Sequence, residues 1–124
     1  AIKAEGNRIA TGYGATVDMH HYEPLFKDMR QDERLVSLVD EVMTEFGESP
    51  RKLPPDEADG STNVGNVSYE VPTAQPTMNR GNQLEAHTPE FACAAWSPYG
   101  LDQAIKGAKI MAVVALRYAE SLEV

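Results

Sequence analysis

The spacing of apolar and polar positions predicts a mixture of strands and helices along this chain. In residues 9–22, IATGYGATVDMHHY, the pattern favours a strand, with Val17, Met19 and His21 on one face of the extended chain. The other face carries Thr16, Asp18, His20 and Tyr22. Residues 67–71, VSYEV, favour a second, short strand that ends at Pro72. Because the predicted strands alternate with predicted helices, the pattern indicates a layered α/β domain.

The clearest predicted helix spans residues 32–47, DERLVSLVDEVMTEFG. Asp32 is suited to cap its first turn, and Gly47 is a typical residue for its end. Its apolar residues recur at helical spacing and form one stripe (Leu35, Leu38, Val39, Val42, Met43 and Phe46).

Two further helices are predicted in the last third of the chain. Thr88 and Pro89 are the residue types expected at the cap and first position of a short helix, which should break near Ser97 and Pro98. A long helix should follow over residues 101–124. One apolar stripe runs along it (Leu101, Ala104, Ile105, Ala108, Ala112, Ala115, Leu116 and Ala119), and further apolar residues flank that stripe (Ile110, Met111, Val113 and Val114). A helix that is apolar nearly all round is usually buried between layers, so we expect this one to require more protein than the chain supplies.

Composition narrows the class of protein. The chain has 124 residues, of which 42% are apolar and 24% charged, as in a globular domain. The net charge of −8, with no cluster of Lys or Arg, argues against a nucleic-acid or anionic-membrane surface. The single Cys93 excludes an internal disulfide, which fits a reducing cytoplasm or simply a domain without disulfides. We find no membrane-spanning run and no signal peptide, and the chain opens on Ala1 in what resembles the middle of a domain.

Several residues are candidates for chemistry. His87 immediately precedes the predicted helix cap, which would fix its backbone as a metal ligand or base requires, although an exposed loop histidine fits the same pattern. Asp18, His20 and His21 suggest a weaker metal site, because adjacent histidines on a strand point in opposite directions. The loop GSTNVGN at residues 60–66 has the composition of an anion-binding turn or of a plain turn, and it lacks the nucleotide-binding patterns. We expect Cys93 to lie in the core.

Taken together, three motifs carry a resemblance to a known family. GSTNVGNVSYEVPTAQP, HTPEF and the terminal IKGAKIMAVVAL occur in order with natural spacing over essentially residues 9–119. They resemble the C-terminal part of dinuclear metal-dependent amidohydrolases of the aminoacylase and carboxypeptidase G family. The most similar branch is that of the p-aminobenzoyl-glutamate hydrolases and β-alanyl dipeptidase-like proteins.

The resemblance implies an architecture and a reaction. Residues 1–23 would be the last strand of an inserted lid that mediates homodimerisation, and residues 24–124 would be the C-terminal part of an α/β catalytic domain. The complete enzyme would hold two divalent metal ions, zinc or manganese, and metal-bound hydroxide would attack amide bonds of N-acyl amino acids, dipeptides or aminobenzoyl-glutamate-like substrates. The partners implied are this small amide or dipeptide substrate and the missing N-terminal part of the same enzyme, with no nucleic acid and no membrane.

The resemblance also assigns residues. His87 matches the family's final metal ligand, and Gly60, Ser61 and Thr62 match a loop that lines the substrate pocket. Asn63 departs from the family, which has Asp there, so any role of that carboxylate is in doubt. The other ligands, the general base and the lid histidine would lie upstream, so we expect the 124-residue chain alone to be inactive. The alternative is a non-catalytic fragment or degenerate remnant that acts as an assembly module.

Overall fold

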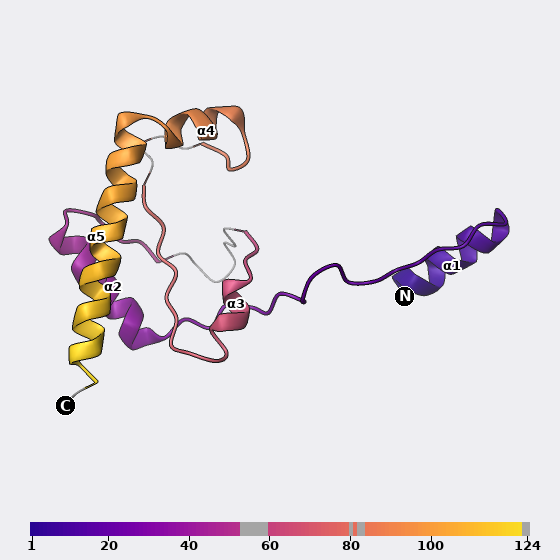
Figure 1. Cartoon of the computed structure of the whole chain (residues 1–124), viewed down its shortest axis with the longest axis horizontal. Helices are drawn as coiled ribbons and strands as arrows, with labels where there is room; N and C mark the ends of the chain where they lie inside the picture. The colour runs from indigo at the N-terminus through magenta and orange to yellow at the C-terminus, as the bar shows by residue number, and fades with distance from the viewer. Residues whose placement is uncertain (53–59, 80, 82–83, 123–124) are drawn as a thin grey trace.

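The chain folds into helices joined by extended segments. The computed structural model describes residues 1–52, 60–79, 81 and 84–122. Its helices are α1 (Ile2–Gly12), α2 (Glu33–Glu45), α3 (Val64–Val67), α4 (Pro89–Ala95) and α5 (Pro98–Glu120), as Figure 1 shows. These described residues contain no strand. The predicted α/β fold class is therefore wrong, and so is the description of residues 1–23 as the last strand of a lid.

The strand predicted over residues 9–22 is replaced by the end of a helix and an extended connector. In α1 the Arg8 guanidinium donates to both carboxylate oxygens of Glu5 at 2.9 and 2.6 Å, one turn away. After α1 the chain turns back, and Met19 lies against Gly6. No β-ladder forms in the described part of residues 9–22, and an alternating pattern without a partner strand satisfies no backbone groups.

The strand predicted over residues 67–71 is also wrong. The Val67 carbonyl accepts hydrogen bonds from the backbone N–H groups of Glu70 and Val71, at 2.9 and 3.1 Å. Such short-range bonds are those of a helical turn and not of a strand. The residues that looked strand-like therefore continue the single turn of α3.

The core is the contact between α2 and α5. Three residues of α2 and two of α5 are buried there (Val39, Val42, Met43, Ile110 and Val114), and Val42 is fully inaccessible. The stripe predicted for residues 32–47 is thus confirmed as a core face. The caps are confirmed too, because Asp32 Oδ1 accepts from Leu35 N at 2.8 Å and Gly47 has a positive φ of 78°.

Ion pairs at the edges of this contact fix how the two helices lie. Arg117 of α5 donates to both carboxylate oxygens of Glu45 at 2.7 and 2.8 Å, and Lys106 pairs with Glu48 at 2.6 Å. At the other end, Arg34 donates to the carbonyl of Ser121. The start of α2 thus lies at the end of α5, so the two helices run in roughly opposite directions.

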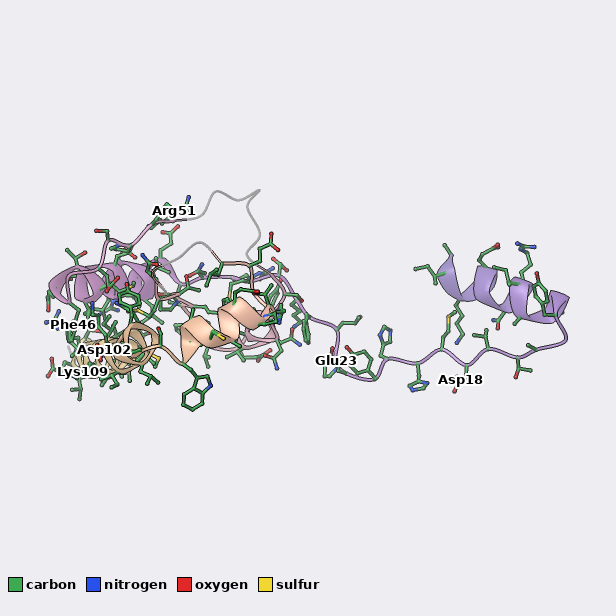
Figure 2. All side chains as sticks on the ribbon, turned by 90° about the horizontal axis from the view of Figure 1, so that it is seen from above. Asp18, Glu23, Phe46, Arg51, Asp102 and Lys109 are labelled. Carbon is green, nitrogen blue, oxygen red and sulfur yellow. The ribbon has the colours of Figure 1, made fainter. Side chains whose placement is uncertain are left out.

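The opposite face of α5 is uncovered. Every residue of the stripe predicted from the sequence is exposed (Leu101, Ala104, Ile105, Ala108, Ala112, Ala115, Leu116 and Ala119), whereas Gln103, Ile110 and Val114 face inward. Asp102 and Lys109, labelled in Figure 2, also belong to α5 and are exposed. In the described residues, no helix is both long and apolar enough to cross a membrane. The residues that the structure describes therefore do not bury α5 on all sides, although the sequence predicted such burial.

The other helices contact the core unequally. α4 packs on α5, whereas α1 packs on no other helix among the described residues. Figure 1 shows α1 apart from the other helices, at the end of a long extended connector. Cys93 of α4 is exposed, so its predicted place in the core is wrong.

Two isoleucines of α5 allow a matched test of this packing. Ile110 is 2% exposed and Ile105 is 56% exposed. We expect Ile110→Ala to lower the free energy of unfolding by about 2–5 kcal/mol, because it leaves a cavity against α2. Ile105→Ala should change it by less than about 1 kcal/mol. Urea unfolding of the two variants measures both values, and equal losses would mean that the outer face of α5 is also covered in solution.

Candidate functional site

His87 has an unusual backbone conformation. Its φ is 64°, and among the described residues other than glycine it alone has a positive φ. Left-handed backbone costs a non-glycine residue about 1–2 kcal/mol, so surrounding structure must hold it there. The imidazole itself is exposed. Strain of this kind gathers at functional sites, which makes His87 a physical candidate for a ligand-binding role.

The helix cap that follows His87 constrains its backbone. Thr88 Oγ1 accepts from Phe91 N at 3.2 Å and donates to the carbonyl of Glu85 at 2.9 Å. Pro89 occupies the first turn of α4. The cap and proline predicted from the sequence are confirmed, and together they bridge the backbone on both sides of His87.

The loop formed by Gly60, Ser61 and Thr62 leads directly into α3. Gly60 has a φ of 131°, a conformation that favours glycine. Ser61 is exposed, and Thr62 Oγ1 accepts from Val64 N at 3.3 Å. The loop thus presents an exposed serine while Thr62 is tied to the start of α3, which suits a loop that donates hydrogen bonds to a ligand.

The second metal candidate lies away from these residues. His20 Nδ1 is 3.5 Å from Asp18 Oδ2, and their side chains are 74% and 91% exposed. Both belong to the extended connector between α1 and the other helices, where Asp18 is labelled in Figure 2. His21 adjoins them in the same connector. An exposed pair of this kind falls short of the three or more ligands that a metal site requires.

A polar clamp joins α3 to the segment that precedes α2. The Asn66 side-chain amide accepts from Lys27 N at 2.8 Å and donates to the carbonyl of Leu25 at 3.1 Å. Ser68 Oγ accepts from Arg30 N at 3.0 Å. A Cβ at Gly65 would collide with the Lys27 carbonyl oxygen, so only glycine allows this approach. We call residues 65–69, GNVSY, and residues 25–30 the clamp.

Tyr69 completes the clamp. Its hydroxyl donates to Asp28 Oδ1 at 2.6 Å, and the Lys27 ammonium and Arg30 guanidinium lie 4.4 and 3.9 Å from its ring centre. The hydrogen bond lowers the pKa of Asp28 and raises the pKa of Tyr69. Because the folded carboxyl has the lower pKa, this bond's contribution is complete above the ordinary Asp pKa and is lost as pH falls through the lowered value.

The structure does not join the two parts of the site that the sequence predicted, the loop 60–62 and His87. No hydrogen bond or ion pair connects the loop 60–62 with His87 in the part of the chain that the structure describes, and those residues contain no cluster of three or more His, Cys, Asp or Glu side chains suited to a metal. One imidazole does not by itself fit a metal ion. The clamp was not predicted from the sequence. Gly65 beside Asn66 is a signal of a close backbone contact. The segment that they contact lies about forty positions earlier in the chain, so no local pattern identifies it as the partner.

An apolar cleft of about 300 Å³ was also not predicted. It lies between α2, α5 and the segment 72–76, and among its lining residues Tyr118 has the only side-chain hydroxyl (Leu35, Val39, Pro72, Ala74, Pro76, Ile110, Met111, Val114, Ala115 and Tyr118). Among the described residues the lining has no carboxylate, imidazole or thiol, so the Tyr118 hydroxyl is the one side-chain group there that can donate a hydrogen bond or exchange a proton.

Comparison of the chain with protein-family models, with curated proteins and with solved structures finds no match.

The strain at His87 gives a test that is independent of any ligand. Glycine accepts a positive φ without the penalty that any Cβ imposes, so His87→Gly should be more stable than His87→Ala by about 1 kcal/mol. Urea unfolding followed by circular dichroism, at low protein concentration, measures the difference. The assigned backbone conformation is wrong if the alanine variant is as stable as the glycine variant or more so.

Proposed function

We propose that this chain is the C-terminal portion of a metal-dependent hydrolase that cleaves amide bonds. Its substrates would be N-acyl amino acids, dipeptides or aminobenzoyl-glutamate-like molecules, as in the aminoacylase and carboxypeptidase G family that it resembles. The observation that carries the proposal is the strained backbone of His87, fixed by the Thr88 cap with its side chain exposed. A ligand histidine needs a fixed backbone and open access: the cap of α4 constrains the backbone of His87, and its side chain is exposed.

The roles proposed for the chain's own residues follow from their surroundings. His87 would supply one ligand to a centre of two divalent metal ions, zinc or manganese. Ser61 and the backbone N–H groups near Gly60 would donate hydrogen bonds to a carboxylate or carbonyl of the substrate. Thr62 is tied through its hydroxyl oxygen to Val64 N, so it would chiefly shape the loop.

The chain would need further protein to act. The described residues supply no cluster of three donors, and the uncovered apolar face of α5 agrees with a chain that packs against more polypeptide. The remaining ligands and the general base would come from the N-terminal part of the same cytoplasmic enzyme. Residues 1–23 would belong to its lid and mediate a homodimer. The isolated chain should therefore hydrolyse no amide substrate, whichever divalent metal is added.

A second candidate function is a non-catalytic assembly module. The same uncovered face of α5 favours it, since large exposed apolar surfaces mark sites of protein association. The two candidates differ in what they require of His87. Assembly through α5 does not involve that imidazole, whereas hydrolysis depends on it.

Alanine variants of the three histidines in the complete protein test the proposed role of His87. We expect His87→Ala to lose bound metal and to lower turnover by at least about a hundredfold, because a missing ligand disturbs the metal centre. His20→Ala and His21→Ala serve as matched controls and should retain metal and turnover, since both lie in the extended connector. Metal analysis and amide-hydrolysis assays measure the outcomes. Two metals per subunit and near-normal turnover in His87→Ala would refute the assignment.

A further inference from the structure

Asn66 binds a neighbouring segment in the way that a strand residue would. Its amide donates to the Leu25 carbonyl and accepts from Lys27 N–H, which are the groups on either side of Phe26. In a parallel β-ladder, the backbone N–H and C=O of one residue bond in the same way to the two peptide groups on either side of the residue opposite. A primary amide can do so because it carries both a donor and an acceptor, whereas an aspartate carboxylate keeps only the acceptors.

This contact is well placed to set the position of the substrate loop. α3 has one turn, Val64–Val67, and a helix of that length does not hold itself in place. Asn66 lies within that turn and fastens it to residues 25–27. The loop 60–62 enters the same turn and is bonded to it through Thr62 Oγ1 and Val64 N. Displacing α3 would therefore displace the loop.

The other half of the clamp lies on the far side of α3 from the loop. Ser68 follows α3 and bonds Arg30 N, while its hydroxyl donates to the Gly65 carbonyl at 2.6 Å. Ser68 therefore supports the same interface at its C-terminal end. Since the loop enters α3 at the opposite end, Ser68 offers a matched control that weakens the clamp without touching the loop's attachment.

We propose that Asn66 is a positioning residue for substrate binding: by replacing a strand neighbour for residues 25–27, it fixes α3 and with it the loop Gly60, Ser61 and Thr62. The inference rests on the proposed function for the role of that loop. It adds a residue that touches no substrate and acts on substrate affinity through the backbone of α3.

The test compares Asn66→Ala, Asn66→Asp and Ser68→Ala in the complete hydrolase. Asn66→Ala should raise KM for the amide substrate about tenfold, with kcat changed by less than about twofold, because it loosens a binding loop. Asn66→Asp keeps the acceptor for Lys27 N–H and should fall between Asn66→Ala and the unaltered protein. Ser68→Ala should raise KM by less than about twofold, because Ser68 holds the end of α3 that lies away from the loop.

Amide hydrogen exchange supplies a readout that does not depend on activity. Asn66→Ala should speed exchange at Lys27 and Val64 about tenfold, and Asn66→Asp should speed it less at Lys27. Ser68→Ala should speed exchange at Arg30 alone. If Asn66→Ala speeds exchange at Lys27 but leaves Val64 and KM unchanged, Asn66 is merely structural and the inference is wrong. If no amide is hydrolysed, the proposed function fails, and unchanged exchange at Val64 would then overturn the positioning role separately.

Discussion

The packing of α5 on α2 is the interaction on which the rest of this structure depends. The buried hydrophobic side chains among the described residues all lie at this contact, around Val42, Ile110 and Val114. Apolar burial is the main favourable term in folding, at roughly 25 cal/mol per Å². A single helix pair buries little apolar surface for a chain of 124 residues. Outside this pair, α4 packs on α5, α3 is fastened by hydrogen bonds to the segment before α2, and α1 packs on no other helix among the described residues.

The most specific of these attachments is polar. Asn66, Gly65 and Ser68 fasten α3 to the segment that leads into α2. The same stretch follows the loop 60–62, so its composition has an architectural cause beside the chemical one that we propose. A glycine and an amide are required to hold the backbone, and hydroxyl and N–H groups remain at the loop for a ligand. His87 is constrained in a comparable way, by the cap of the next helix.

Helix signals that are local were readable in the sequence. Asp32, Thr88 and the proline that follows it act within one turn of their own position, and each was predicted correctly. The strands over 9–22 and 67–71 were predicted from alternation alone, and they failed because a strand depends on partners that local pattern does not specify. The clamp was missed for the related reason that its two halves lie far apart in sequence. Whether His87 and the loop 60–62 form a site remains a prediction.

The apolar stripe of α5 was predicted correctly as a pattern, but the burial expected for it is not found among the described residues. It was recognised from the spacing of Leu101, Ile105 and their alanine neighbours, and the structure leaves it exposed while α2 covers the other side. The central claim is that this face packs against further protein. Sedimentation velocity of the isolated 124-residue chain over a range of concentrations tests it most directly. The account predicts association that grows with concentration and weakens when Ile105 and Leu116 are both changed to serine. A chain that stays monomeric throughout and melts cooperatively would contradict it.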